Sequence, residues 1–523
     1  MKIYLVGGAV RDELLNRPVK DLDWVVVGGT PEYFLNNNYE QVGADFPVFL
    51  HPETKDEYAL ARKERKVGHG YNGFECVFDD TVTLKEDLYR RDLTINALAK
   101  DENNEIIDYF NGQQDLKNKV LRHVSENFKD DPLRVLRVAR FMARYKEYGF
   151  SVAEETMELM KSMVKSKELN HLTAERVLLE TEKALLENNP EEYFLTLKEC
   201  GALEVVFPEI DKLFGVPQPP EHHPEIDTGV HTMMVLQQAK KIDPQNLNVL
   251  WGALLHDLGK GETPKEVLPQ HLLHEKRGVN IIKNFATRLK MSSSNANISM
   301  LTSRYHTHVH RSFDIQPKKI WSLFKKTDAF RKPERFRDIL KICEADAKGR
   351  TGLENKPYPQ REFLNNILEN VLNINNKNII EKINFENIPN NEKGNTIAGN
   401  IRKAQIENIS ETIDITLNKD NILKKYSFLK NLNNINEKKL TTIGKLNNKD
   451  RLFQFLIDNL NMSLNDQKNI NTLCKKVNSI DGKEFFDKGL RGSEIGEAIR
   501  KEKANIISEF KRKKNSKKLS KKP

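Results

Sequence analysis

The stretch that decides the fold reads IYLVGGAVRD over residues 3–12 and is followed by DLDWVVV over residues 21–27. The first apolar run predicts a buried strand, and the two glycines after it let backbone N–H groups approach a triphosphate. Residues 10–15 can open a helix whose N-terminus favours anions. Asp21 and Asp23 precede and begin the second apolar run, where side chains two residues apart point to the same face of a strand. The two carboxylates can therefore hold two divalent cations that stabilise the oxygens of an in-line phosphoryl displacement.

Each piece has a plainer interpretation, because a Gly-Gly pair alone is more often a turn and an Asp-x-Asp is more often a loop or a cap. Their order and spacing resemble the signature of the DNA-polymerase-beta-like nucleotidyltransferases. The wording of residues 4–12 looks like the bacterial CCA-adding tRNA nucleotidyltransferases and their poly(A) polymerase relatives. The resemblance implies that Asp21 and Asp23 are catalytic and bind Mg²⁺, and that Gly8 and Arg11 bind the nucleotide.

A second motif, EDLYRRDLTINAL, covers residues 86–98. Helical spacing predicts that its apolar residues Leu88, Ile95 and Leu98 face inward while Arg91 is able to clamp a phosphate bidentately. The alternative is a surface helix laced with ion pairs. The whole phrase is similar to a family motif in which the second arginine contacts the incoming nucleotide, so the resemblance assigns that role to Arg91.

Between these two motifs, EYALAR at residues 57–62 is predicted to form a strand, and residues 63–73 a mobile loop that contains glycine. Glu57 is a candidate for a third catalytic carboxylate.

A third motif, DDPLRVLRVARF, covers residues 130–141. Asp131 is placed as a helix N-cap, with the proline after it as the first helical residue, so capping alone could explain it. Three arginines spaced three apart form a basic stripe, which is usually a solvated face, while neighbouring apolar residues fill a core. The motif resembles a family element whose Asp and Arg hydrogen-bond the Watson-Crick edge of the base. It implies that Asp131 and Arg134 read the base and that Arg137 and Arg140 reach the phosphates.

The Asp-Arg pair explains a choice of bases without a template. An ionised carboxylate only accepts hydrogen bonds and an arginine only donates them, which suits an amino group beside a ring-nitrogen acceptor. Cytosine and adenine present that pattern, whereas guanine and uracil would leave both protein groups unpaired at about 1–3 kcal/mol each. The site is therefore expected to accept CTP and ATP, the set needed to build a 3′ C-C-A end.

Nine of the thirteen histidines fall between residues 222 and 310. His256-Asp257 ends an apolar helical run, and with His231 upstream and Asp346 downstream it resembles the H…HD…D arrangement of HD-superfamily phosphohydrolases. A lone His-Asp is more often a core hydrogen bond. Imidazole and carboxylate together suit a transition metal, with Ni²⁺ as one candidate. The candidate ligands are His231, His256, Asp257, His274, His306 and Asp346, whereas His222, His223, His308 and His310 are interpreted as surface residues or as residues behind the ligands.

Composition fits a multi-domain intracellular enzyme. A chain of 523 residues is too long for one core, so about three or four units are expected. The net charge of +9 suits a polyanionic partner. Four widely spaced cysteines, with no signal peptide or membrane span, predict a cytoplasmic protein with reduced thiols. The expected partners are tRNA, CTP and ATP, with no membrane and no obligate protein partner, as a monomer or homodimer.

The C-terminal part departs from the family. Residues 365–478 have Asn at about a quarter of positions, a bias that argues against a packed core. The phrase Gly-x-x-Ile-x-x-x-Ile-Arg-Lys occurs at residues 394–403 and recurs at residues 492–501, where it is closer to the family pattern. Either the tail is duplicated or the chain carries a long extension. The lysine-rich residues 511–518 are expected to form a disordered arm able to touch phosphates.

The expected fold class is α+β, a polymerase-beta-like head followed by all-helical neck, HD and tail domains. The expected boundaries are 1–125 for the head, 126–225 for the neck, 226–350 for the HD domain, 351–410 for the tail and 411–523 for the extension. The expected function is addition of CCA to tRNA together with a metal-dependent phosphohydrolase activity, either 2′,3′-cyclic phosphodiesterase, 2′-nucleotidase or phosphatase. The rivals are a poly(A) polymerase, a partial CC- or A-adding enzyme, and a nucleotide-signalling HD hydrolase.

Overall fold

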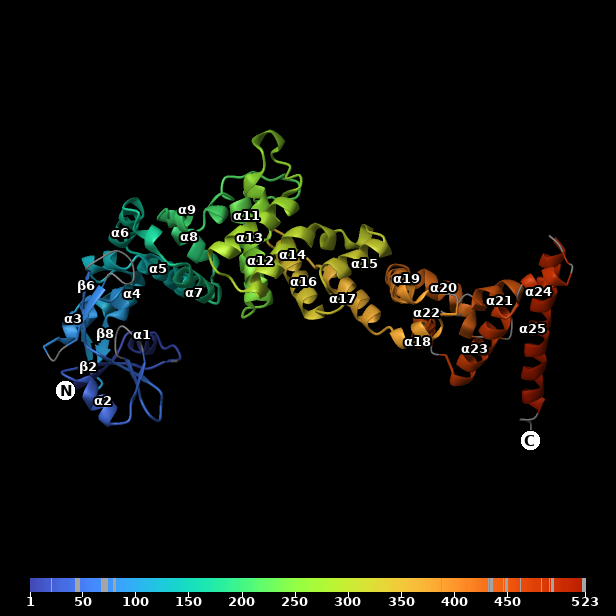
Figure 1. Cartoon of the computed structure of the whole chain (residues 1–523), viewed down its shortest axis with the longest axis horizontal. Coiled ribbons are helices and arrows are strands. Elements are labelled where there is room, and N and C mark those ends of the chain that lie inside the picture. Colours follow the sequence, from blue (N-terminus) through green and yellow to red (C-terminus); the bar gives the residue numbers. More distant parts are fainter. Residues whose placement is uncertain are drawn as a thin grey trace. The chain divides into compact units, whose positions relative to one another are not determined.

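The structure is a computed structural model of the whole chain (Figure 1). It describes every residue except 20, 43–47, 67–73, 79–80, 387, 431, 433–435, 445, 447–449, 461, 481, 489, 491–492 and 520–523. The chain divides into two compact units, of which the first comprises residues 1–310 and 334–358 and the second comprises residues 311–333 and 359–523. Among the described residues, no helix is both long enough and apolar enough to cross a membrane.

The N-terminal part of the first unit is built on a seven-stranded mixed sheet with the order β3-β4-β5-β2-β1-β8-β9. Strands β2 and β5 run parallel, and the other neighbouring pairs run antiparallel. The strands are β1 (Lys2–Val6), β2 (Asp23–Val27), β3 (Glu40–Val42), β4 (Val48–Leu50), β5 (Glu57–Leu60), β8 (Leu98–Lys100) and β9 (Ile106–Asp108). A separate hairpin pairs β6 (Lys63–Lys66) with β7 (Phe74–Val77), so the first residues of the loop expected at 63–73 form a strand and the rest lie outside the described residues.

Both faces of this sheet are buried. Val25 on β2 belongs to one apolar cluster and its neighbour Val26 belongs to another, as the alternation of side chains along a strand requires. The helices of this region are α1 (Gly8–Leu14), α2 (Pro31–Asn36), α3 (Leu84–Tyr89) and α4 (Gly112–Asn118). Leu84 and Leu88 of α3 join the cluster of Val25, so α3 lies against the face that also carries Asp23.

The motif at residues 86–98 does not form one helix, which corrects the expectation of continuous helical spacing. Helix α3 ends at Tyr89, and a short 3₁₀ helix, Thr94–Asn96, leads into β8. The side chain of Asp92 accepts a hydrogen bond from the N–H of Leu93 at 2.8 Å, which favours a turn over another helical turn. The three apolar residues nevertheless face inward as predicted, since Leu88, Ile95 and Leu98 are fully buried.

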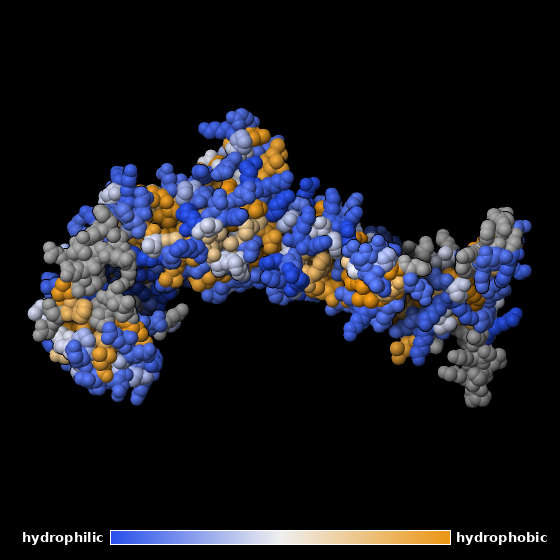
Figure 2. All heavy atoms as spheres, in the orientation of Figure 1, coloured by the Kyte–Doolittle hydropathy of each residue, from blue (hydrophilic) through white to orange (hydrophobic). Residues whose placement is uncertain are grey.

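The rest of the first unit is helical. After the sheet come α5 (Leu133–Tyr145), α6 (Glu154–Lys165), α7 (Ala174–Leu185), α8 (Glu191–Glu199), α9 (Ala202–Val206) and α10 (Pro208–Asp211). Besides these helices, a short parallel pair joins β10 (Val120–Leu121), which follows α4, to β11 (Ser151–Val152), which precedes α6. The histidine-rich region follows with α11 (Thr228–Ile242), α12 (Leu247–Leu255), α13 (His274–Arg288), α14 (Ser293–His310) and α16 (Pro333–Lys348). The face seen in Figure 2 is largely hydrophilic here, because the apolar sides of these helices are turned inward.

In the second unit, helices are the regular elements that the described residues form. Its first helices are α15 (Pro317–Lys326), α17 (Pro359–Leu372), α18 (Asn376–Glu381) and α19 (Asn390–Leu417). Its remaining helices are α20 (Lys419–Tyr426), α21 (Glu437–Gly444), α22 (Asp450–Leu460), α23 (Leu464–Asn478), α24 (Gly482–Asp487) and α25 (Ser493–Leu519). The expected fold class, an α+β head followed by helices, is confirmed.

Two expectations about the C-terminal part are wrong. Residues 426–506 contain a buried cluster that includes Leu440, Ile443 and Leu456, each with no exposed side-chain area, so the Asn-rich stretch does pack a core. Most of the asparagines in these helices whose burial is described are exposed, while leucine and isoleucine keep the helical spacing. Residues 511–518 continue α25 rather than forming an irregular arm, because lysine and arginine extend a helix that has already begun.

The core in the second unit can be tested with two leucines. Leu456→Ala removes a fully buried side chain and should lower the stability of this unit by about 2–5 kcal/mol. Leu464→Ala is the matched control, because Leu464 is 76% exposed and its loss should change little. The measurement is urea unfolding of the full chain followed by circular dichroism. Equal curves for the two variants would mean that the cluster contributes no stability.

Candidate active sites

Three carboxylates gather at one end of the head sheet. In the parallel pairing of β2 with β5, Asp23 lies directly beside Glu57, and Asp21 precedes Asp23 by two residues. All three side chains are open to solvent. The pKa of Asp23 is raised, mainly by desolvation and also by the charge of Asp21, and the charge of Arg91 opposes this rise only in part. Desolvation and the charges of Asp23 and Asp21 raise the pKa of Glu57. The cluster therefore carries excess negative charge that a cation would relieve, and carboxylate oxygens are the donors that Mg²⁺ prefers.

Arg91 faces this cluster from the segment after α3. Its Nη2 lies 3.3 Å from Oδ2 of the fully buried Asp87, and its buried Nε makes no hydrogen bond within the described part of the chain. A Cβ on Gly7 would lie 2.9 Å from Nη1 of Arg91, and the φ of Gly7 is +70°. A side chain at residue 7 would therefore collide with the guanidinium and strain the backbone, which explains the first glycine of the pair.

Arg11 lies deeper than the sequence suggested. Its side chain is 4% exposed, and its Nε and Nη2 each donate to a carboxylate oxygen of Asp12 at 3.0 Å. Its Nη1 donates to Asn96 Oδ1 at 2.5 Å, and the guanidinium lies 5.4 Å from the ring centre of Phe141 and 5.5 Å from that of Tyr145. These partners give Arg11 a structural explanation as a contact between α1 and α5. Gly8 lies beside it, with room for a Cβ 3.4 Å from Arg11 Nη2.

Asp131 and Arg134 do not bond to each other in this structure. Asp131 accepts two hydrogen bonds from Arg176 of α7, at 3.1 and 2.8 Å, and a third from the N–H of Leu133 at 3.0 Å. Arg134 donates to the carbonyl oxygens of Asn127 and Arg90, at 2.7 and 2.5 Å. The N-cap of α5 is Pro132 rather than Asp131 as expected, although Asp131 still accepts a bond from the N–H of the first helical residue. Sequence reasoning missed Arg176, which no motif marks.

The two remaining arginines of the α5 stripe pair with carboxylates. Arg137 Nε donates to Asp92 Oδ2 at 2.7 Å, and this pairing lowers the pKa of Asp92 despite its burial. Arg140 is buried, with its Nε 2.5 Å from Glu180 Oε1 and its Nη1 3.4 Å from Glu187 Oε1. The stripe is therefore not a solvated face. Arg140 joins α5 to α7 through its pair with Glu180, so we assign it no role in the proposed nucleotide transfer.

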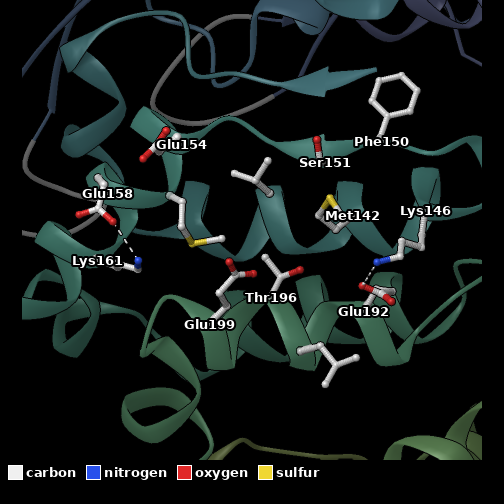
Figure 3. Close-up of a pocket in the computed structure, with 13 residues that line it drawn as sticks. Met142, Lys146, Phe150, Ser151, Glu154, Glu158, Lys161, Glu192, Thr196 and Glu199 are labelled. Atoms are coloured by element: carbon white, nitrogen blue, oxygen red, sulfur yellow. Dashed lines mark hydrogen bonds and ion pairs between the residues drawn. The ribbon is translucent and has the colours of Figure 1, made fainter. Parts of the chain in front are cut away.

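A cavity of about 500 Å³ lies in the neck against α5, α6 and α8 (Figure 3). Its wall includes four glutamates and two lysines, and the lysines are already paired, Lys161 with Glu158 at 2.9 Å and Lys146 with Glu192 at 3.0 Å. No residue that the sequence predicts as a ligand lines it. Its net negative charge does not suit a triphosphate or an RNA backbone.

The histidine-rich region brings all six predicted metal ligands together. His231, His256 and Asp346 form one group of potential ligand atoms, and Asp257, His274 and His306 form another. The groups adjoin, because His256 Nε2 lies 3.1 Å from Asp257 Oδ2. Asp257 Oδ1 lies 3.4 Å from His274 Nε2 and 3.7 Å from His306 Nε2. His231 Nε2 lies 3.2 Å from Asp346 Oδ1. The pocket therefore offers two adjoining positions for a cation.

Hydrogen bonds fix the tautomer of each candidate histidine. In all four, Nδ1 lies within 3.1 Å of backbone carbonyl oxygens, namely Gly349, Ala253, His271, Thr302 and Ser303. A carbonyl only accepts, so Nδ1 carries the proton and a neutral ring turns its Nε2 lone pair into the pocket. Burial lowers the pKa of His306 to about 3, which keeps that ring neutral.

The pocket has the donor chemistry of a metal centre. Nε2 of His231, Nε2 of His256 and Oδ1 of Asp257 are buried and make no hydrogen bond among the described residues. Burial of Asp257 would raise its pKa, but the neighbouring His256 and Lys260 hold it well below the usual range, so the carboxylate is ionised. Buried nitrogen lone pairs and carboxylate oxygens that face one another without a proton between them need a cation as their partner. These residues therefore fit a divalent metal.

Further residues support the ligands and were missed by sequence reasoning. Glu225 Oε1 lies 3.0 Å from His231 Nδ1 and 2.9 Å from His223 Nδ1. Lys260 Nζ lies 2.6 Å from Asp257 Oδ2 and donates to Gln218 Oε1 at 2.6 Å. Lys260 follows His256-Asp257 closely enough for the sequence to have indicated it, whereas Glu225 lies in a proline-rich loop with no such signal.

Comparison with known families decides the identity. Residues 3–122 match the poly A polymerase head domain, residues 149–214 match the probable RNA and SrmB-binding site of polymerase A, and residues 228–346 match the HD domain. The multifunctional CCA protein of Actinobacillus pleuropneumoniae serotype 5b (strain L20) is 57% identical over 366 residues, which cover 69% of this chain and 89% of that relative. The chain belongs to the multifunctional CCA protein family. It is thus a nucleotidyltransferase that also carries an HD domain.

Solved structures show the same fold. A CCA-adding enzyme in complex with ATP aligns with a TM-score of 0.52 and 21% identity over 83% of this chain and 91% of that chain. The Thermotoga maritima CCA-adding enzyme complexed with tRNA aligns with a TM-score of 0.51 and 19% identity over 80% of this chain and 91% of that chain.

The raised pKa of Asp23, caused by desolvation and by the charge of Asp21, predicts that this carboxylate lowers stability while it serves activity. The pKa of Asp23 is higher in the folded protein than in the unfolded chain. At pH values above that raised pKa, the ionised carboxylate therefore lowers the free energy of unfolding. Asp23→Asn should therefore raise the melting temperature of the metal-free protein at pH 7, with the gain vanishing below the ordinary carboxyl pKa. The same variant should lose nucleotide addition by about 100-fold or more. Thermal melts at pH 3.5 and pH 7, and primer-extension gels, would check both parts. A melting temperature that falls at pH 7 contradicts the charge assignment.

Proposed function

We propose that Asp21, Asp23 and Glu57 hold the divalent cations with which this CCA-adding enzyme transfers CMP, CMP and AMP to the 3′ end of tRNA. The proposal rests on the β2–β5 register, which sets Glu57 beside Asp23. Two Mg²⁺ ions bound there would stabilise charge on the attacking and leaving oxygens. Arg91, whose positive charge lowers the pKa of Asp23, would bind a phosphate oxygen of the nucleotide.

Asp131 and Arg134 are proposed to select the base. Both lie at the start of α5, where Arg134 bonds to the backbone carbonyl of Arg90, the residue before Arg91. This bond ties the base-reading end of α5 to the phosphate-binding segment. Arg176 holds both oxygens of Asp131 and so orients its carboxylate. Arg137 supports the same segment through Asp92, and we propose that it acts near the phosphates.

Removing the Asp131 carboxylate should relax the base choice. Asp131→Ala is expected to let UTP or GTP compete with CTP and ATP, because about 1–3 kcal/mol per unpaired group no longer opposes the wrong edge. Arg134→Ala should act in the same direction. The measurement is addition to tRNA lacking its CCA with each nucleotide alone, resolved at single-nucleotide steps. The matched control is Glu126→Ala, an exposed acidic residue nearby. If both variants lose rate but keep the wild-type preference, Asp131 acts only as a cap and as a partner of Arg176.

The HD domain is proposed to hydrolyse phosphoesters such as 2′,3′-cyclic phosphates at the six-residue metal pocket. Each bound cation would polarise a phosphoryl oxygen and lower the pKa of a coordinated water. The mixed imidazole and carboxylate donors favour a transition metal, with Ni²⁺ as one candidate, over Mg²⁺. His231, His256, Asp257 and Asp346 would form the first position, and His274 and His306 would complete the second with Asp257.

Metal content can separate the two positions. His274→Ala should reduce the bound metal of the HD domain from two equivalents to one. His256→Ala and Asp257→Ala should lower the metal content too, and they should also eliminate phosphoester hydrolysis. All three should retain CCA addition, because the head carries its own ligands. His308→Ala, an exposed residue of the same helix as His306, is the control. Plasma mass spectrometry of the dialysed proteins and hydrolysis of a 2′,3′-cyclic phosphate give the readouts. Unchanged metal content in His256→Ala would reduce the cluster to structure.

We further propose that the protein works in the cytoplasm, where its substrate tRNA is handled. The described residues contain no membrane-spanning helix, and three described cysteines, Cys200, Cys343 and Cys474, are free and buried.

A further inference from the structure

The two oxygens of Asp346 face different partners. Oδ1 points at the metal pocket, 3.2 Å from His231 Nε2 and 4.0 Å from His256 Nε2, and Arg350 Nη2 lies 3.5 Å from it. Oδ2 points away from the pocket and lies 2.7 Å from His310 Nε2. The carboxylate itself is 4% exposed, so these contacts define its orientation.

The bonds around His310 have one consistent direction. A carboxylate oxygen only accepts, so Nε2 of His310 carries the proton and donates to Asp346. Nδ1 of a neutral ring is then an acceptor, and the phenol of Tyr358, 2.8 Å away, donates to it. Burial raises the pKa of Tyr358 and keeps that phenol protonated. This tautomer is the opposite of the one found in the four candidate metal ligands, so His310 is oriented toward the carboxylate rather than toward the cation.

We propose that His310 and Tyr358 are positioning residues of the HD centre, which hold Asp346 so that only Oδ1 is presented to a metal. A carboxylate whose second oxygen is occupied binds with one oxygen, and it leaves a coordination position open for water or a phosphoester oxygen. Without the donor, Asp346 is free to turn and occupy that position with its second oxygen. The inference rests on the proposed metal-dependent function of the HD domain.

A purely structural explanation is also available, and the test must separate it. The rings of His310 and Tyr358 pack edge to face with centres 5.7 Å apart, so either residue could simply join α14 to the segment after α16. Loss of packing lowers the melting temperature but does not alter how a bound metal absorbs light. Glutamine at residue 310 can place an N–H near the position of Nε2, whereas leucine fills the space without a donor.

The experiment titrates the full-length protein with Co²⁺, whose visible spectrum reports coordination. All proteins carry Asp21→Ala and Asp23→Ala to remove the proposed cation ligands of the head. His310→Leu should weaken Co²⁺ binding by about 10–100-fold and change the spectrum. His310→Gln should restore most of the affinity. Tyr358→Phe, which deletes only the hydroxyl, should weaken binding by about fivefold, as expected for one net hydrogen bond. His308→Leu, two residues away and exposed, is the control and should match the parent protein.

The outcomes are distinguishable. Parent-like affinity and spectrum in His310→Leu would overturn the inference, and so would a lower melting temperature in both His310 variants without a spectral change. A parent protein that binds no Co²⁺ and hydrolyses no phosphoester would instead remove the proposed HD function, and the positioning of Asp346 would fall with it.

Discussion

The contact between α1 and α5 is built around one buried cation, the guanidinium of Arg11. It lies 5.4 Å from the ring centre of Phe141 and 5.5 Å from that of Tyr145, both on α5, and bonds to Asp12 and Asn96. Asn96 in turn donates to Asp92, which holds Arg137. One continuous chain of charge and hydrogen bonds thus joins α1, the segment after α3 and α5. These three elements lie beside the glycines, the arginine proposed to bind phosphate and the pair proposed to select the base. Removing one partner from such a buried network lowers the free energy of unfolding by about 3–5 kcal/mol. The residues around the proposed active site are therefore also residues that stabilise the fold.

Local rules were enough to predict that Asp21 and Asp23 lie close together, because side chains two residues apart on an extended chain point to one side. The charge of Asp21 does raise the pKa of Asp23, although β2 begins only at Asp23. The neighbour relation of Glu57 could not be derived, since it depends on which strands pair and in which register. The same limit explains Arg176, which lies 45 residues beyond Asp131 and meets it only through the packing of α7 on α5. Arg140 shows the converse case, because the phosphate contact implied by the family motif stays a prediction while a buried pair with Glu180 supplies a structural explanation. Motifs identify residues, whereas partners from distant elements decide what those residues are free to do.

Composition misled the interpretation of the C-terminal part. Asparagine is a poor helix former, yet a helix in a folded protein is stabilised mainly by burying one face. In α22 the buried leucines at residues 452, 456 and 460 recur every four residues, and this spacing, not the overall bias, determines the outcome. The match to the Actinobacillus relative leaves almost a third of this chain uncovered. Residues 426–506 nevertheless form a core, so a deletion of residues 411–523 would cut through α19 and remove that core together with Ile415, which packs against it.

The two proposed metal sites differ in ways that keep them separate within one chain. The head offers oxygen donors that are open to solvent, and their mutual repulsion is relieved by hard cations that retain water. The HD pocket is buried and offers imidazole nitrogens whose tautomers are fixed by backbone carbonyls before any metal arrives. Because Mg²⁺ gives up its water reluctantly and imidazole suits softer ions, neither site is suited to the other's metal. Selectivity therefore follows from donor type and burial, and the two reactions can proceed in one protein without competing for a cation.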